Sequence, residues 1–550
     1  MIEDKNRIFD GWISLEGGVD AGREPELIEP TLSESAVNMT FRGGNATTRP
    51  GIRKITEKFG DLYNQQLWCY NQKVWIAPDP PPYQPADFIE GQYVDPANGA
   101  PFPPPSYLEN ENSEYIYRYG IVQCAQAFSP HNGNDCIMAL IGGRLFKITP
   151  GGVPIKDDSG NITIPSPLTA DVEEIFVEDS NGPALRNRED TKIGFMVQAD
   201  KWLIAQDGFS RAIIYDGGVA RRAKLDVDID HTEIPVGTMM AYGMGRIVVI
   251  VNDRDVAFGD LYGSHDLPDP ADSLILFTER NFLAEGFDAA IPFTQGVATG
   301  MIFFPQLDTS TGNGQLMVFA ERGATSFFLS LPREVWKTSQ FQILSLLTTG
   351  LRGHRSIAVV NEDLWFRSDD GMRSYRQARS EPDGWTHIPQ STNVRQYLAN
   401  DAEWLLKYTS AAYFDNRVLC TTSPMWNQGR PIHFGLVVVD FDILSSFGVV
   451  NTKPAWEGQW TMNDYGVFPV QLLTGNFNGI TRCFMFGLDG TNRNQLYELS
   501  VNDKDDFDGQ LINWDLVTRK FDFQKLQPQS TPFTENELYG GDIWLKDIVE

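Results

Sequence analysis

Two acidic clusters hold the residues of this chain whose types and spacing best suit chemistry. In the first, Asp226, Asp228 and Asp230 alternate with apolar residues, so on a strand their three carboxylates would share one face. Like charges about 7 Å apart reduce stability unless that face meets water or cations. An ordinary exposed edge strand and a negatively lined channel or rim both meet this condition, and the sequence leaves both open.

The second cluster has the outline of a calcium-binding loop. Gly509 follows two aspartates as the loop glycine does, and Asp515 stands at the position of the final acidic ligand. Lys504, however, occupies the first ligand position, and a cation there defeats calcium binding. We therefore expect a solvated turn and no metal site.

Sequence signatures of common catalytic sites are missing. The chain has no P-loop, zinc-protease, nucleophile-elbow or strand-anchored dinucleotide motif. Its six histidines are far apart, and none has a partner at metal-ligand spacing. Because 73 residues are Asp or Glu, a glycosidase pair could be drawn almost anywhere, so carboxylate spacing discriminates little. We expect a protein that is not an enzyme, with no catalytic residues, no cofactor and no metal.

The charge is strongly negative: 45 Lys and Arg against 73 Asp and Glu give −28. Such a chain repels nucleic-acid backbones on average, which disfavours generic DNA or RNA binding. Two interpretations are compatible with this net charge. The charge can keep the protein soluble through self-repulsion, or it can let the surface stay near a polyanion without adhering to it. Neither a signal peptide nor a membrane span is expected. Five dispersed cysteines without a CxxC fit reduced thiols made in a cytoplasm.

Strands must position these residues, because helical periodicity is scarce. Asn393–Thr409 is the best helical candidate, with Val394, Tyr397, Leu398, Trp404 and Leu405 able to share a stripe. Almost everywhere else, short runs of β-branched and aromatic residues are bounded by Gly, Asp, Asn and Pro. The fold class is therefore predicted to be all-β.

One unit, two apolar runs joined by a polar turn, recurs along the chain. Its copies begin near Gly143, Lys201, Gly245, Gly314, Glu362, Asn416 and Arg482. Successive starts are 44 (201 to 245) to 69 (245 to 314) residues apart, roughly the length of a four-stranded blade. The pattern predicts a β-propeller of about six to eight blades, with an N-terminal hairpin segment and inserted loops.

Three regions follow from this pattern: an N-terminal segment with an entry hairpin (1–60), the propeller (61–500) and a C-terminal extension (501–550). A proline-rich insertion at 77–115, with runs at 80–82 and 103–105, interrupts the propeller. Prolines cannot donate ladder hydrogen bonds and favour extended polyproline geometry. A protruding docking arm and an insertion without a partner are both compatible with this composition.

Cations and glycines gather in the entry hairpin of this acidic chain. We assign a turn to Gly43 and Gly44, and an exit at Pro50-Gly51. The cations Arg42, Arg49, Arg53 and Lys54 are expected to pair with acidic groups of the same or a neighbouring subunit. The candidate assembly hairpin therefore comprises Arg42, Gly43, Gly44, Arg49, Pro50, Gly51, Arg53 and Lys54.

The order of these elements resembles the opening of nozzle and tail-hub proteins of short-tailed bacteriophages (podoviruses), of the tail tubular B and packaged-DNA stabilisation types. The shared elements are Gly17-Gly18, Asn38, Gly43-Gly44 and Arg49-Pro50-Gly51. Residues 245–261, 361–376 and 416–442 resemble the repeat hairpins of the same family.

The resemblance implies a homohexameric propeller-based ring in the virion tail, assembled in the host cytoplasm. It would bind the tail adaptor protein and tail fibres or spikes. Its role would be to form the distal tube, retain packaged DNA and open for ejection. Double-stranded DNA would pass without sequence-specific binding, and acidic walls suit such passage because they repel phosphate. Ring symmetry would multiply each acidic row into a girdle.

Two other classes of protein remain open. A carbohydrate-binding or glycan-hydrolysing propeller would use tryptophans as stacking platforms. The candidates are Trp365, Trp404, Trp426, Trp456 and Trp460, for which blade core and subunit packing is the other interpretation. A cellular scaffold propeller that binds peptides on one face is the second class.

Overall fold

A computed structural model gives the structure of most of the chain. It describes residues 15–29, 31–59, 67–70, 73–76, 113–131, 133–152, 155–156, 162–163, 168–175, 177–178, 187–224, 231–261, 277–278, 287–304, 315–329, 336, 342–344, 349–360, 363–375, 389–442, 454–477, 479–501, 503–507 and 509–519. Asp226, Asp228 and Asp230 lie outside these residues, as does most of the proline-rich insertion (77–112). The predictions for an acidic channel face and a docking arm therefore stay predictions.

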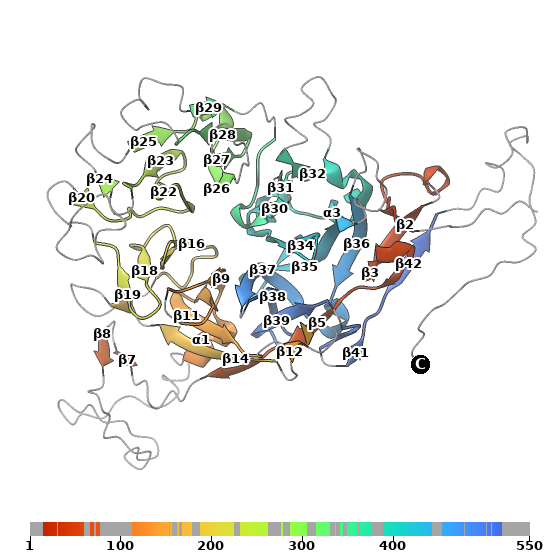
Figure 1. Cartoon of the computed structure of the whole chain (residues 1–550), viewed down its shortest axis with the longest axis horizontal. Coiled ribbons are helices and arrows are strands. Elements are labelled where there is room, and N and C mark those ends of the chain that lie inside the picture. The colour runs from red at the N-terminus through yellow and green to blue at the C-terminus, as the bar shows by residue number, and fades with distance from the viewer. Residues whose placement is uncertain are drawn as a thin grey trace, which may run out of the picture.

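Strands dominate the described residues, and seven sheets of three or more strands follow one another around a ring (Figure 1). We number these sheets 1 to 7 in chain order, and each is given below from its first strand outward.

Sheet 1 contains β9 (Val122–Phe128), β10 (Cys136–Ile141), β11 (Arg144–Pro150), β14 (Thr169–Ile175) and β6 (Thr56–Phe59). Sheet 2 contains β16 (Phe195–Ala199), β17 (Trp202–Gln206), β18 (Ile213–Tyr215), β19 (Ala220–Arg222) and β15 (Val177–Glu178). Sheet 3 contains β21 (Met240–Gly243), β22 (Arg246–Ile250), β23 (Asp255–Phe258) and β25 (Phe287–Ala290). Sheet 4 contains β26 (Ala298–Phe304), β27 (Gln315–Ala320), β28 (Gly323–Phe327) and β29 (Gln342–Leu344).

Sheet 5 contains β30 (Ala358–Val360), β31 (Asp363–Ser368) and β32 (Gly371–Ser374). Sheet 6 contains β33 (Ala411–Phe414), β34 (Arg417–Asn427), β35 (Arg430–Asp440), β36 (Ala455–Thr461), β1 (Gly18–Val19), β2 (Leu32–Val37) and β42 (Asp515–Thr518). Sheet 7 contains β37 (Phe468–Phe477), β38 (Ile480–Leu488), β39 (Asn494–Ser500) and β5 (Gly51–Lys54).

The remaining elements are short. Five strand pairs stand apart: β3 (Met39–Thr40) with β4 (Thr47–Thr48), β7 (Leu67–Tyr70) with β8 (Lys73–Ile76), β12 (Ile155–Lys156) with β13 (Ile162–Thr163), β20 (His231–Thr232) with β24 (Phe277–Thr278), and β40 (Asp505–Asp506) with β41 (Gln510–Leu511). The α-helices are α1 (Ser113–Tyr119) and α3 (Arg395–Leu398), and 3-10 helices span Pro25–Leu27, Arg42–Gly44, Phe293–Gln295, His354–Ser356, Gln390–Val394, Glu403–Tyr408 and Asn463–Tyr465.

Apolar side chains fill the spaces between successive sheets all the way around the ring. One cluster joins sheets 2, 3 and 4, and others join sheets 4 with 5, 5 with 6, 6 with 7, 7 with 1 and 1 with 2. Alternating strand residues supply these layers because each sheet faces a neighbour on both sides. A closed ring of sheets packed face to face is a β-propeller, so the predicted all-β propeller of about six to eight blades is confirmed.

Each of the seven repeat copies falls in a different sheet. Six of them form adjacent antiparallel strands, such as β22 with β23 and β38 with β39. In the first copy, β11 pairs instead with β14, because the expected second run forms the separate pair β12–β13. The spacing of the repeated unit therefore predicted the positions of the blades, although it did not predict every strand.

The predicted helix Asn393–Thr409 is interrupted. It divides into α3 and the 3-10 helix Glu403–Tyr408, with Asp401 between them. The Asp401 carboxylate accepts hydrogen bonds from the Ser423 backbone (2.6 Å) and from Arg367 (2.7 Å). Side-chain bonds of this kind compete with continued helix. The apolar stripe is confirmed in part: Val394, Leu398 and Leu405 are buried and Tyr397 is partly buried, but Trp404 is exposed.

The N-terminal segment closes the ring from outside. Its strands β1 and β2 extend sheet 6, β5 ends sheet 7 and β6 ends sheet 1, so residues 18–59 line three consecutive sheets. β5 pairs antiparallel with β39, near the other end of the described chain. From the C-terminal extension, β42 pairs with β2. The N-terminal segment and the C-terminal extension are thus paired through β2 and β42, and the segment covers sheet edges that would otherwise be open.

Candidate functional site

The entry hairpin exists but is shorter than the sequence suggested. β3 pairs with β4, and between them Gly43 and Gly44 have φ of 76° and 78°, the left-handed region that favours glycine. Residues 51–54 leave the hairpin to pair with β39. At Gly51 a Cβ atom would lie 2.0 Å from the Asp505 carbonyl oxygen, so this crossing requires glycine.

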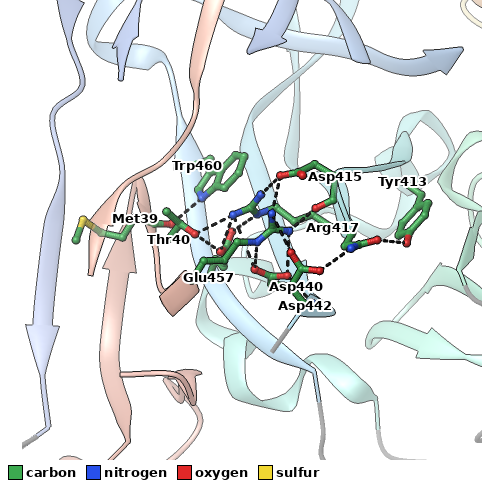
Figure 2. Close-up of polar contacts among 11 residues, drawn as sticks. Met39, Thr40, Tyr413, Asp415, Arg417, Asp440, Asp442, Glu457 and Trp460 are labelled. Carbon is green, nitrogen blue, oxygen red and sulfur yellow. Dashed lines mark hydrogen bonds and ion pairs between the residues drawn. The ribbon is translucent and has the colours of Figure 1, made fainter. Parts of the chain in front are cut away.

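Arg42 lies against three aspartates at the end of sheet 6 and in its adjoining turns. Figure 2 labels these aspartates, Asp415, Asp440 and Asp442. Its guanidinium binds Asp440 through two hydrogen bonds (2.7 and 3.1 Å) and Asp415 through one of 2.7 Å. A carboxylate oxygen of Asp442 lies 3.1 Å from its Nη1. Arg42 is partly exposed, so this group ties the hairpin to the rim of the sheet.

Arg417 and Glu457 form the buried half of the same network (Figure 2). Arg417 Nε donates to Glu457 at 2.9 Å, and its Nη2 donates to the Thr40 hydroxyl at 2.9 Å. That hydroxyl in turn donates to Glu457. The Trp460 indole N–H donates to the Met39 carbonyl oxygen at 3.0 Å. The network thereby attaches β3 to the middle of sheet 6.

Four carboxylates (Asp415, Asp440, Asp442 and Glu457) face two guanidiniums in this network. Burial raises the pKa of Glu457, and the charge of Arg417 and its hydrogen bond oppose that rise. The charge state of Glu457 therefore depends on Arg417.

Arg49 is fully buried and uses all five of its N–H donors. Asp506 accepts two of them (2.9 and 2.5 Å), Asn38 Oδ1 accepts Nε–H at 2.9 Å, and the carbonyls of Pro50 and Thr461 accept the remaining two at 2.9 and 3.1 Å. Asp506 Oδ1 also accepts the Ile52 backbone N–H at 3.0 Å. We call Arg49, Asn38 and Asp506 the clasp, because they join the N-terminal segment to the C-terminal extension.

The other hairpin cations lie nearer the surface. Arg53 binds Asp503, one hydrogen bond measuring 2.8 Å, and both side chains are partly exposed. Lys54 is exposed beside Tyr497 of β39. Arg42, Arg49 and Arg53 thus pair with carboxylates of their own chain. Asp506, the aspartate of the calcium-like loop, is occupied by Arg49, and no group of three or more His, Cys, Asp or Glu side chains in the described residues is arranged to hold a metal.

The propeller axis is crossed by His354 and Arg355, which precede β30. The Met301 backbone N–H on β26 lies 3.4 Å from His354 Nδ1, and the His354 ring lies 5.8 Å from that of Phe195 on β16. Arg355 Nη1 donates to Gln471 Oε1 on β37 at 2.6 Å and to the Gln123 carbonyl on β9 at 3.4 Å.

Two consecutive residues therefore reach the first strands of sheets 1, 2, 4 and 7 at once. Side chains of this length can contact four sheets only where those sheets converge at the centre of the ring. The axis is consequently filled at this level, and a nucleic-acid duplex cannot pass through the middle of one chain.

Acid is expected to destabilise this centre. Burial, followed by the charge of Arg355, lowers the pKa of His354 to about 4; burial also lowers the pKa of the fully buried His433 to about 3. Both pKa values lie below the value of about 6.5 in unfolded chains, so the folded state binds fewer protons and stability is lost as pH falls from about 6.5 toward 4.

The H354Q/H433Q variant should flatten that loss by up to about 1.4 kcal/mol per pH unit for each histidine. Urea unfolding of the variant and the wild type at pH 7.5, 6 and 4.5 measures it. Parallel pH profiles would contradict the assignment.

The five candidate tryptophans separate into two groups. Trp365, Trp456 and Trp460 are buried blade residues, whereas Trp404 and Trp426 are 62% and 39% exposed. Cys124, Cys136, Cys420 and Cys483 are buried free thiols. None of the helices in the described part of the chain has the length and apolar character that a membrane crossing requires.

Sequence reasoning missed the partners of the hairpin and the residues at the axis. Arg417, Glu457 and Asp506 have no distinctive local motif, and only the unusual density of cations at 42–54 signalled that such partners existed. His354 and Arg355 follow two closely spaced glycines, a weak signal for a chain crossing a crowded place.

Comparison with known proteins adds little beyond the fold. No family model and no curated protein matches the chain. Among solved structures, a match is the Cps50 (Swd1) β-propeller domain of Myceliophteria thermophila, with 10% identity over 70% of this chain and 98% of that domain, and a TM-score of 0.35. The computationally designed Ika8 protein matches with 8% identity over 69% of this chain and 99% of its own, and a TM-score of 0.31.

Proposed function

We propose that this chain is a structural subunit of a homo-oligomeric ring, the distal tail tube or nozzle of a short-tailed phage, which retains packaged DNA and conducts it at ejection. The resemblance of residues 17–55 to that family motivates the proposal. It requires subunits that bind one another, a wall that does not hold DNA, and a conduit wide enough for a duplex.

The observation that carries the proposal is the open edge of sheet 6. β42 ends that sheet and pairs, within the described residues, only with β2. Three large apolar side chains on or just before this strand are solvent-exposed: Leu511 (72%), Trp514 (55%) and Val517 (40%). An open strand edge beside exposed apolar side chains favours pairing with another chain. A second copy of this chain suits the edge, because in a ring the edge of each copy can bind a different surface of the next copy, and the same contact then joins every neighbouring pair.

Charge and the filled axis support the same arrangement. A net charge of −28 makes the average surface repel DNA phosphates, which suits a conduit and opposes a DNA-binding role. Because His354 and Arg355 fill the propeller axis, the conduit lies between subunits. The duplex is then enclosed by several propellers side by side, and no single chain encircles it.

Replacing Trp514 with glutamate and Val517 with lysine is expected to convert the ring into monomers, because charges at the edge oppose apolar contact and strand pairing. Light scattering coupled to size-exclusion chromatography, followed by negative-stain microscopy, measures the change in mass and shape. V219E is the matched control, since Val219 is similarly exposed (51%) in a turn of sheet 2. A monomeric wild-type chain, or unchanged rings in the double variant, would contradict the proposed interface.

A further inference from the structure

One exposed aromatic cluster is not explained by the fold or by the proposed ring. Trp404, from the 3-10 helix Glu403–Tyr408, and Trp426, near the end of β34, are stacked with ring centroids 6.2 Å apart at 28°. The Tyr408 ring supports Trp426 from below, edge-on at 5.5 Å, and is itself buried. We call Trp404, Trp426 and Tyr408 the aromatic platform.

Two exposed indoles on a rigid base require an explanation. A fully buried indole would contribute to the blade core, but these side chains keep 62% and 39% of their surface in water. Large aromatic side chains gathered on a surface mark a place where another group binds. Tyr408 is held by the core, and Trp426 is held by the ladder between β34 and β35, in which it lies opposite Pro431. The platform is therefore prepared before any ligand arrives.

We propose that the aromatic platform binds the proline run 101–105 of the same chain. That run, PFPPP, contains a PxxP spacing and an additional aromatic residue. Proline-rich segments favour the polyproline II helix, which docks on surfaces built from Trp and Tyr at little entropic cost. The run lies outside the described residues, and the platform consists only of described ones.

Reach within one chain supports this occupant. The chain re-enters the structure at Ser113, the first residue of α1. Seven residues (106–112) therefore lie between Pro105 and that point, and the eight Cα–Cα steps span up to about 28 Å when extended. α1 itself is about 10 Å long. At its far end the Tyr119 hydroxyl accepts from Arg493 at 2.9 Å.

Asn492, the residue before Arg493 in that turn, contacts the strand end that carries Trp426. Its carbonyl accepts from Arg430 at 2.6 Å and its side chain accepts from Asn427 at 2.7 Å. Asn427 follows Trp426 in sequence. One short helix and two side-chain contacts therefore separate the re-entry point from the aromatic platform, and a linker of seven residues is compatible with a path of this kind.

The test uses the full-length chain and a synthetic peptide of residues 98–108. In the P103A/P104A/P105A variant the platform is vacant, so the peptide should bind at least about tenfold more tightly than to the wild type, whose own run competes at high effective concentration. Adding W404A and W426A should abolish binding. F209A is the matched control, because Phe209 is equally exposed (62%) on sheet 2, and it should bind as before.

Each other outcome overturns the proposal. Equal peptide affinity for the wild type and the proline variant would mean that the run does not occupy the platform. No binding to a variant that melts like the wild type, or binding that survives W404A/W426A, would exclude this site. Oligosaccharides that bind the wild type on a glycan array, and lose binding in W404A, would assign the platform to sugars. A change in assembly mass on W404A substitution would assign the occupant to another copy.

Discussion

Replacing Arg49 with methionine is expected to destabilise the protein by about 3–5 kcal/mol, because it leaves the buried Asp506 without its cation. Both side chains are almost wholly buried, at 0% and 2% exposure. The loss also removes the guanidinium donors to the carbonyls of Pro50 and Thr461, and leaves Asn38 Oδ1 with the Thr461 backbone N–H as its other donor. Methionine keeps much of the volume, so the effect reports on the polar contacts.

The strands in which the R49M variant loses hydrogen-exchange protection should show that the clasp has been broken. Hydrogen exchange should become faster first in β5 and β40, the two strands that Arg49 connects, while the middle strands of sheets 2 to 4 keep their protection. Thermal unfolding and native-state hydrogen exchange measure the two parts of the prediction. Uniformly faster exchange in every sheet would mean that Arg49 does not act by joining the N-terminal segment to the C-terminal extension.

Two further variants test whether the R49M loss comes from the burial of the ion pair and from the unpaired charge of Asp506. R53M removes a neighbouring ion pair whose side chains are 22% and 20% exposed, and should cost at most about 1 kcal/mol. R49M/D506N should recover much of the R49M loss, since asparagine is neutral and keeps an oxygen for the Ile52 N–H. An R53M effect as large as that of R49M would contradict the assignment.

The blades could be predicted from the sequence because their central strands are contiguous. Pairs such as β22 with β23 are separated by short polar turns, so both the apolar alternation and the turn residues appear within one window. The contacts that join the N-terminal segment to the C-terminal extension could not be predicted in this way. Arg49 and Asp506 are 457 residues apart, and a local pattern carries no information about such a contact.

The entry hairpin also combines a local feature that the sequence predicts with a long-range contact that it does not. Positive φ at Gly43 and Gly44 follows from local turn chemistry and was foreseeable. That residues 51–54 would leave the hairpin for β39 depends on the edge of β39 opposite β38, to which β5 is added in sheet 7. Likewise, five tryptophans looked alike in sequence, and only the packing of sheets 5 and 6 decided that Trp365 and Trp456 are core residues while Trp404 is exposed.

Replacing Arg417 with methionine is expected to cost about 3–5 kcal/mol at pH 7.5, with a pH dependence that distinguishes it from R49M. Arg417 binds the fully buried Glu457 through hydrogen bonds of 2.9 and 3.3 Å, and its charge opposes the rise that burial causes in the pKa of Glu457. It also holds the Thr40 hydroxyl and so the hairpin strand β3. R352M is the control, because Arg352 pairs at the surface with Asp369 and Glu403, and it should cost at most about 1 kcal/mol.

The sign of the pH effect follows from Glu457. Burial already raises its pKa in the folded state, and removing Arg417 raises that pKa further. The folded variant then binds a proton that the unfolded chain has released, so its stability rises relative to the wild type as pH falls toward 5. A neutral carboxyl group no longer needs the guanidinium, and the R417M deficit should shrink.

Urea unfolding of R417M and the wild type at pH 8 and pH 5 measures this difference, and comparing the two proteins at each pH cancels the shared effect of the buried histidines. R417M/E457Q should recover most of the loss at pH 8, since glutamine removes the charge and still accepts from Thr40. A deficit of equal size at both pH values, together with a double variant no more stable than R417M, would show that Arg417 acts through packing alone. The smaller deficit at pH 5 is expected because a protonated Glu457 carries no charge that Arg417 must balance.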